Sequence, residues 1–263
     1  MMETSEAKQT LQKIDSMLHA ESDPTRAAGL LRDSAAAIGF PLCAAITDVS
    51  GHSAGLGSEE RRLMERFGWP VRMINRWFSR AFVRQHPIYL RCRFENSVFW
   101  VQHEEMWKSL EPLTPAQEQM RTELEEFGLF GTVVAPVHLA LGRTGAVVWA
   151  TQKPQNLESI VTLHASVIRS IAYRIMEILV PDVPLRVSAQ DLSYLTDRQI
   201  DCLSWIARGK TIAETAQILD LSIHTVREHL REITRRLNAS NTTQAVALAC
   251  ELGIVKPLLK EEP

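Results

Sequence analysis

Residues 195–255 read LTDRQIDCLSWIARGKTIAETAQILDLSIHTVREHLREITRRLNASNTTQAVALACELGIV, and this stretch decides the fold of the C-terminal part of the chain. Thr196 can accept a backbone N–H as an N-cap, and Gln199, three residues later, completes a capping box. Apolar residues then recur at helical spacing until Gly209 ends the first helix. The four predicted helices run from Thr196 to Gly209, from about 212 to 219, from Ser222 to about 238, and from 243 to 252.

The third of these helices has two distinct faces. Its apolar residues follow one another at steps of four, three and four, which predicts one buried stripe: Val226, Leu230, Ile233 and Leu237. Its arginines recur every four residues on a separate face: Arg227, Arg231 and Arg235. A short helix, a tight turn and a second helix with a basic outward face are what a helix-turn-helix needs to enter a major groove. The candidate DNA-contacting residues are Lys210, Ser222, Thr225, Arg227, Glu228, Arg231 and Arg235.

A helical bundle with a solvated arginine face fits the same spacing. From Leu195 to Ser240, seven Lys and Arg stand against six Asp and Glu, so the net charge is only +1. That balance falls short of an obviously basic domain. Spacing and charge alone therefore leave both interpretations open.

The whole stretch also resembles the four-helix DNA-binding domain of LuxR/FixJ-type regulators. The positions that carry the resemblance are Leu195, Thr196, Arg198, Leu203, Ala207, Gly209, Lys210, Ala216, Leu219, Ser222, Thr225, Val226, His229, Ile233, Leu237, Ala245 and Ala249. Gln199 departs from the family, which usually has Glu, and this change should weaken a structural ion pair. Thr242 departs from the common Arg, which removes an expected phosphate contact. The resemblance implies that the stretch binds double-stranded DNA.

Length and composition set limits on the rest of the chain. With 263 residues, 45% hydrophobic and 23% charged, the sequence is typical of a soluble protein of two domains. The net charge of −2 favours no class of partner. Because the N-terminus lacks a signal-peptide pattern and no apolar run reaches about 18 residues, we expect a cytoplasmic protein without membrane contact. The four cysteines have no CxxC spacing, so we expect no metal site, no disulfide and no cofactor.

The N-terminal part alternates predicted helices and strands. Helical patterns precede and follow the break at Asp23-Pro24, and Gly39 ends the second of them. A further helical pattern over 70–84 places Met73, Trp77 and Ala81 on one face. The remaining predicted elements are strands over 41–49 and 98–101, a helix that begins at Thr114-Pro115, a hairpin over 132–139 and 146–151, and a long helix over 157–179.

This order predicts an α/β domain in which a sheet lies between helices, joined to an all-α helix-turn-helix domain. We expect the α/β domain over residues 1–180, a linker marked by prolines over 181–194, and the DNA-binding domain over 195–263. A sheet covered by helices can hold a small molecule between the two layers. The first domain is thus a candidate ligand-binding domain.

Residues 15–180 resemble, more weakly, the autoinducer-binding domain of LuxR-type quorum-sensing regulators. In lactone-binding members, a Trp and a Tyr four residues apart, an Asp before a Pro and a later Trp surround the ligand head group. Here Met73, Trp77 and His86 stand at the first three positions, and Trp100 at the fourth. The Met and Trp replacements resemble those of plant-associated LuxR solos, which respond to non-lactone signals, whereas His86 fits neither pattern.

The change from Asp to His alters the chemistry of the expected pocket. An ionised Asp only accepts hydrogen bonds and suits an amide N–H, whereas a neutral His offers one donor and one acceptor. We therefore expect poor binding of ordinary acyl-homoserine lactones. Gly131 lies five residues before Pro136, which leaves Thr132 at the position nearer the pocket. The candidate ligand-binding residues are Met73, Trp77, His86, Tyr89, Phe99, Trp100 and Thr132, although the apolar ones also suit a plain hydrophobic core.

The sequence thus predicts a transcriptional regulator whose activity a small-molecule signal modulates. Small and apolar residues of the fourth C-terminal helix, such as Ala245, Val246, Ala249 and Cys250, lead us to expect a homodimer that binds an inverted-repeat site. A conventional lactone receptor and a ligand-independent anti-activator that forms heterodimers remain alternatives. A response regulator lacks support because no receiver-type acidic pair is present, and an enzyme lacks support because no motif brings Cys92, His86 and His103 together.

Overall fold

The structure is a computed structural model that describes residues 2–49, 62, 64–77, 82, 85–140, 142–180 and 195–256. Its contacts divide the chain into two compact units, one formed by residues 1–139 and 143–181 and the other by residues 140–142 and 182–263. The predicted linker over 181–194 lies outside the described residues.

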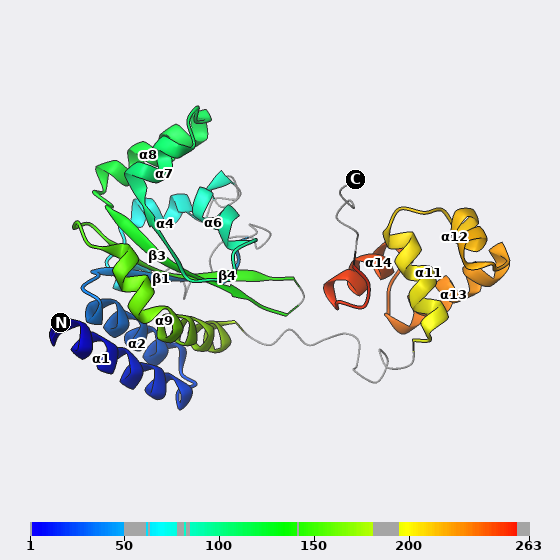
Figure 1. Ribbon diagram of the computed structural model, residues 1–263, viewed down its shortest axis with the longest axis horizontal. Helices are drawn as coiled ribbons and strands as arrows, with labels where there is room; N and C mark the ends of the chain where they lie inside the picture. The colour runs from blue at the N-terminus through cyan, green and yellow to red at the C-terminus, as the bar shows by residue number, and fades with distance from the viewer. Residues whose placement is uncertain are drawn as a thin grey trace. The chain divides into compact units, whose positions relative to one another are not determined.

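A four-stranded antiparallel sheet organises the first unit (Figure 1). Its order is β1-β4-β3-β2, so the hairpin of β3 and β4 forms the centre. The central strands are buried along almost their whole length, as strands with helices on both faces must be. The strands are β1 (Leu42–Ile46), β2 (Phe99–Gln102), β3 (Gly131–His138) and β4 (Thr144–Thr151).

One face of the sheet packs against α2 (Pro24–Ala37) and the long helix α9 (Leu157–Leu179), and α1 (Met2–His19) packs on these two helices. Trp149 of β4 points to this face, since its indole N–H donates to Ser34 Oγ of α2 at 2.9 Å. The residues two positions away along the strand therefore point to the same face. Close-packed side chains fill this interface, and a Cβ at Gly145 would meet Met176 of α9.

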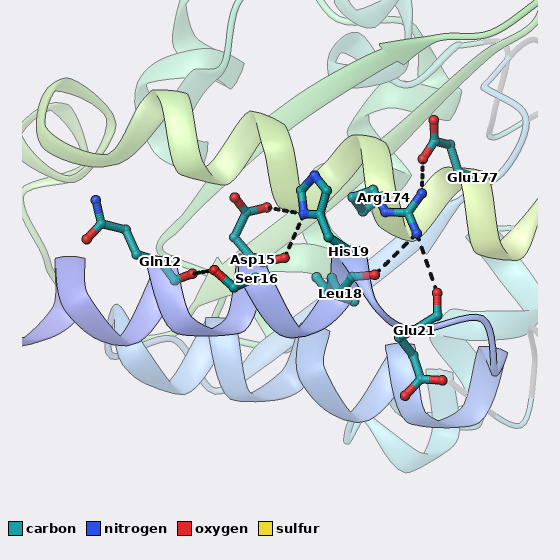
Figure 2. Close-up of polar contacts among 8 residues, drawn as sticks. All are labelled: Gln12, Asp15, Ser16, Leu18, His19, Glu21, Arg174 and Glu177. Carbon is teal, nitrogen blue, oxygen red and sulfur yellow. Dashed lines mark hydrogen bonds and ion pairs between the residues drawn. The ribbon is translucent and has the colours of Figure 1, made fainter.

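Polar contacts also fasten α1 to α9 (Figure 2). Arg174 of α9 forms an ion pair with Glu177 on its own helix. Its other terminal nitrogen donates to the carbonyl oxygens of Leu18 at 3.3 Å and Glu21 at 3.4 Å, at the end of α1. The Leu18 carbonyl also accepts the backbone N–H of Glu21 at 3.1 Å, so the guanidinium adds a second contact just where α1 ends.

The opposite face of the sheet is covered by shorter helices. Trp69, which precedes the first of them, donates its indole N–H to Cys43 O of β1 at 2.7 Å. These helices are α4 (Val71–Trp77), α6 (Pro87–Cys92), α7 (His103–Ser109) and α8 (Pro115–Glu126). A sheet between two helical layers confirms the predicted fold class of this unit.

The second unit consists of four helices around one apolar core. Capping boxes begin two of them, at Thr196 with Gln199 and at Thr211 with Glu214. Asp220 adopts φ of 52° at the tight turn before the third helix. The helices are α11 (Asp197–Ala207), α12 (Ile212–Leu219), α13 (Ile223–Arg236) and α14 (Thr242–Glu251), which confirms the predicted all-α helix-turn-helix.

Several predicted elements are confirmed within one or two residues at each end, but the predicted strand over 41–49 is shorter in β1. Of the predicted helix over 70–84, α4 covers Val71–Trp77, and most of the residues after Trp77 lie outside the described ranges. The sequence pattern also predicted neither α6 nor α7, which are only 6 and 7 residues long. Helices that short give too few turns for an apolar period to stand out.

Candidate ligand cavity and nucleic-acid interface

A small cavity of about 40 Å³ lies between the sheet and the shorter helices. Thr132 of β3 and Ala150 of β4 form its floor, because they pair directly and so point to the same face of the sheet. None of the described residues that line it carries a carboxylate or a permanent positive charge. The lining residues are Trp69, His86, Ile88, Tyr89, His103, Leu124, Leu129, Thr132, Val148 and Ala150.

His86 is the N-cap residue of α6, yet its side chain makes no capping hydrogen bond. Instead the ring is 5% exposed and packs against aromatic rings, with centroids 4.9 Å from both Phe82 and Tyr89. Its Nδ1 atom has no hydrogen-bond partner among the described residues. Burial, with a smaller effect of His103, lowers the pKa of His86 to about 3, so the ring is neutral near pH 7.

His103, the first residue of α7, forms the second polar group of the cavity. Its Nε2 shares a hydrogen bond with Thr132 Oγ1 at 2.8 Å, and its Nδ1 has no partner among the described residues. Burial lowers its pKa to about 4. Trp107, one turn further along α7, is 2% exposed, and its indole N–H also lacks a partner in the part of the chain described.

Three buried polar atoms thus lie without protein partners, within the described ranges, in one region. The rings of His86 and Trp107 meet edge to face, with centroids 6.3 Å apart, and His103 contributes to the same cavity as His86. An unpaired buried polar group costs about 1–3 kcal/mol. Folded proteins rarely keep several of them together, so this cluster is a candidate place for a water molecule or a ligand to supply the missing hydrogen bonds.

A larger and more open groove of about 540 Å³ adjoins the cavity. His103, Leu124 and Leu129 line both spaces, so these three side chains separate one from the other. The inner cavity is far below the ~300–1,000 Å³ of typical ligand sites, whereas the groove falls within that range.

The structure brings only some of the predicted ligand-binding residues together. His86, Tyr89 and Thr132 line the cavity. Met73 and Phe99 are each 4% exposed and belong to the same hydrophobic core, but they do not line the cavity. The backbone of Trp77 ends α4, and its side chain lies outside what the structure describes.

Trp100 lies on the wrong face of the sheet for this cavity. It pairs directly with Val133, so both point to one face, and Thr132, the neighbour of Val133, points to the other. Gly131, two residues from Val133, faces Leu157 of α9. The expectation that Trp100 and His86 share one pocket therefore does not fit the strand register.

Sequence reasoning missed Trp69, His103 and Trp107. In the sequence, His103 stands out only as a candidate zinc ligand or base, and no pattern links it to Thr132, 29 residues away. The alternation of side chains along β3 could have shown that Thr132, and not Gly131, points toward the shorter helices. No cluster of three or more metal-ligating side chains occurs in the described ranges.

The second unit presents α13 as its most polar surface. Val226, Leu230, Ile233 and Leu237 are buried, which confirms the predicted apolar stripe. At the start of the helix, the Ser222 hydroxyl accepts the backbone N–H of Thr225 at 2.9 Å and so caps the helix, and it shares a further hydrogen bond of 2.8 Å with Thr225 Oγ1. The predicted DNA-contacting residues Arg227, Glu228, Arg231 and Arg235 are exposed on one side of α13.

Carboxylates accompany most of the predicted cations. Arg231 donates to Glu228 at 2.5 Å, Arg235 donates to Glu232 at 2.9 and 2.6 Å, and Lys210 lies 3.7 Å from Glu214. These pairs explain why the unit carries little net positive charge although its arginines share a face. A phosphate that approaches must compete with a resident carboxylate.

Two sequence-based arguments about this unit need correction or extension. Ala245 and Ala249 of α14 are 1% and 0% exposed within the unit's own core, so they do not offer the contact surface that the dimer argument assumed. Val246 and Cys250 are only partly buried. Gln199 accepts the backbone N–H of Thr196 at 3.0 Å, so it completes a capping box without the Glu that the family usually has.

No helix among the described residues is long and apolar enough to cross a membrane.

Known proteins match both units. Residues 23–175 match the family model of the autoinducer binding domain, and residues 193–249 match that of bacterial regulatory proteins of the luxR family. The chain is 34% identical over 138 residues to the transcriptional activator protein AhyR of Aeromonas hydrophila, which is 52% of each chain. It is 32% identical over 142 residues to the quorum sensing-dependent regulator RpaR of Rhodopseudomonas palustris, 54% of this chain and 56% of that one.

The matched region thus spans about half the length of these curated relatives. Among solved structures, Escherichia coli SdiA aligns with a TM-score of 0.55 over 93% of this chain and 97% of that chain, at 16% identity, which shows a shared fold. Because the autoinducer-binding model alone covers more than half of the sequence, the chain belongs to the LuxR-type family of bacterial regulatory proteins with an autoinducer-binding domain.

Proposed function

We propose that this protein is a DNA-binding transcriptional regulator modulated by a small-molecule signal that is not a standard acyl-homoserine lactone. The observation that carries the proposal is the group of buried atoms around the cavity that have no partner among the described residues: Nδ1 of His86, Nδ1 of His103 and the indole N–H of Trp107. Family membership supports both halves of the proposal, a ligand-binding unit and a helix-turn-helix unit.

The chemistry of the cavity favours an uncharged ligand group that both donates and accepts hydrogen bonds. Two neutral imidazoles offer a donor or an acceptor each, according to their tautomers, and the indole of Trp107, which lines the adjoining groove, offers a donor. A carboxylate or phosphate finds no permanent cation there, and an amide N–H finds no carboxylate, among the described residues that line the cavity. A hydroxyl group satisfies these requirements best. The solved SdiA complex with octanoyl-rac-glycerol shows a hydroxylated ligand on a chain of the same fold.

The proposed mechanism couples this cavity to DNA through assembly. A ligand that binds one conformation better than another shifts the population toward it. The proposed homodimer would then hold two α13 helices at the spacing of an inverted-repeat site, with Arg227 and Arg231 toward the bases. The Met and Trp replacements at positions 73 and 77 support a further part of the proposal, that the chain resembles the LuxR solos of plant-associated bacteria.

The test combines ligand identification with a pocket exchange. The purified full-length protein is examined by native mass spectrometry for a copurified compound, and its melting temperature is measured with acyl-homoserine lactones and with long-chain monoacylglycerols. We expect stabilisation by the hydroxylated compounds and little by lactones, because a ligand that binds the folded state raises apparent stability. Strong stabilisation of the unmodified protein by a common lactone would instead establish the conventional lactone receptor.

Variants sharpen this comparison. Trp77→Tyr combined with His86→Asp restores the lactone-type residues and should move the preference toward lactones. His19→Asp, at an exposed position of α1, makes the same change of residue type away from the cavity and should leave the preference unchanged. An unchanged preference in the double variant would remove His86 from the ligand site.

One observation favours a second candidate function. The cavity of about 40 Å³ holds little more than a water molecule, which suits a regulator that needs no ligand and acts by forming heterodimers. Under that alternative, no compound would copurify, no compound would shift the melting temperature, and a related regulator would bind in a pull-down from a defined mixture.

A further inference from the structure

Glu228 occupies the part of α13 that points furthest from its own core. It lies two residues from each of Val226 and Leu230, both buried, and two residues correspond to about half a helical turn. Its side chain is 50% exposed, and that of its partner Arg231 is 74% exposed. Any surface that receives this face of α13 therefore meets Glu228.

A carboxylate at this position conflicts with simple phosphate binding. DNA phosphates repel it, and α13 would bind the backbone more tightly without it. Glu232 differs, because it accepts hydrogen bonds from both Arg235 and Arg236 and is only 32% exposed. Two arginines of the same helix compensate the charge of Glu232. Glu228 pairs only with Arg231 among the described residues, and the side chain of Arg231 is mostly in solvent.

The major groove offers few groups that an ionised carboxylate can contact. A carboxylate only accepts hydrogen bonds, so it needs a donor, and the base edges provide donors as the N4 amino group of cytosine and the N6 amino group of adenine. Adenine places its N7 acceptor beside N6, and that lone pair repels the second carboxylate oxygen. Cytosine has no such neighbouring acceptor on its own edge. The carboxylate therefore discriminates in favour of cytosine.

We propose that Glu228 is a sequence-reading residue of the DNA interface, where its carboxylate accepts a hydrogen bond from the N4 amino group of one cytosine in each half-site. In the free protein, the carboxylate accepts a hydrogen bond from the Arg231 guanidinium. On DNA, the two side chains present an acceptor and a donor next to each other. This inference rests on the proposed DNA-binding function and specifies which base Glu228 recognises.

In vitro selection from a random duplex library tests the proposal, with the full-length protein and the variants Glu228→Ala and Glu228→Gln. The unmodified protein should enrich a motif in which one position of each half-site is cytosine, with ~10-fold or greater preference. Glu228→Ala should lose the preference at that position only and bind random DNA more tightly. Glu228→Gln should move the preference to adenine, because a carboxamide can donate to N7 and accept from N6.

Glu232→Gln is the matched control, since it removes the same charge from the same helix. It should change affinity and its salt dependence but leave every base preference in place. An unaltered motif with Glu228→Ala, or the same loss of preference with Glu232→Gln, would overturn the assignment of Glu228 while the proposed function stands. Failure of the unmodified protein to enrich any motif would overturn the proposed function itself, and this inference with it.

Discussion

The two faces of the sheet in the first unit differ in how they satisfy their polar groups, although Nδ1 of His164 on α9 also lacks a partner among the described residues. Toward α9, the Trp149 indole N–H finds Ser34 Oγ at 2.9 Å, and Gly145 and Gly131 are glycines because helix side chains fill the space of a Cβ. Toward α6 and α7, the indole of Trp107 and two imidazoles have no partner among the described residues, and a cavity remains.

This difference separates structural residues from candidate functional ones. Both faces are equally buried, so burial alone does not distinguish them. Unsatisfied hydrogen-bonding groups reduce stability, and a chain keeps them together where another molecule completes them. We therefore expect substitutions toward α9 to act on stability, and substitutions toward α6 and α7 to act on ligand binding.

The largest effect on stability is expected from Gly145→Ala, which adds a methyl group to the close-packed interface between the sheet and α9. The new Cβ would lie 2.1 Å from Met176 Cε and 2.8 Å from the backbone oxygen of Ile46. Met176 can move but the neighbouring strand cannot, so the free energy of unfolding should fall by about 3 kcal/mol. Urea unfolding of the first unit measures this change.

Gly29→Ala is the matched control, because a Cβ added at this position of α2 would have no other atom within 4 Å. Alanine in a helix interior should raise the free energy of unfolding by about 0.5–1 kcal/mol. Equal losses of stability in the two variants would show that the α9 face is not close-packed.

The next effect is a loss of stability in mild acid that originates on the cavity face. Burial lowers the pKa of His86 to about 3 and that of His103 to about 4 in the folded protein, below the ordinary histidine value of 6.5. The unfolded chain therefore binds more protons than the folded one below about pH 6.5, and stability falls as pH falls. Between about pH 7 and about pH 5, each histidine should contribute a loss of about 2 kcal/mol.

Single variants show which histidine causes this pH dependence of stability. His103→Gln or His86→Gln should each flatten the curve in that window. His164, whose pKa burial also lowers, acts in the same direction from its position on α9, so some slope should remain. A slope that neither cavity variant alters would mean that both rings take up protons freely in the folded state.

The sequence predicted the second unit more fully than the first because its signals are local. Thr196 and Gln199 form the predicted capping box, and the four-three-four stripe of α13 is buried as expected. Each of these features depends on residues within a few turns of one another. Periodicity and capping are therefore sufficient to place the outward face on which Arg227 and Glu228 stand.

The cavity could not be predicted in the same way because its residues meet only through strand register. Its neighbours in the sequence suggest a pocket position for Trp100, but its pairing with Val133 turns it to the α9 face. A shift of one residue in a strand moves a side chain to the opposite face. His103 and Trp107 belong to a helix of 7 residues, too short for its apolar period to show which way it faces.

A smaller effect compares two buried tryptophans on opposite faces. Trp149→Phe loses the hydrogen bond to Ser34 Oγ, whereas Trp107→Phe removes an N–H that has no partner among the described residues. Both lose the same ring volume, so Trp149→Phe should cost about 1–2 kcal/mol more in unfolding free energy. With a long-chain monoacylglycerol added, Trp107→Phe should show the larger loss of thermal stabilisation. Equal costs without ligand and equal stabilisation with it would remove the distinction between the faces.

The smallest effect concerns the outer side of α9, where Arg174 fastens the end of α1 (Figure 2). Arg174→Gln removes the hydrogen bonds to the carbonyl oxygens of Leu18 and Glu21, and the side chain is already 26% exposed, so water replaces part of what is lost. The free energy of unfolding should fall by about 0.5–1 kcal/mol, and amide exchange should quicken in the last turn of α1. Arg169→Gln, an exposed position on the same helix, is the control and should change neither quantity. Neither arginine borders the cavity, so the rise in melting temperature that a ligand produces should be the same in both variants. If Arg174→Gln alone reduced that rise, α1 and the α9 face would take part in ligand binding.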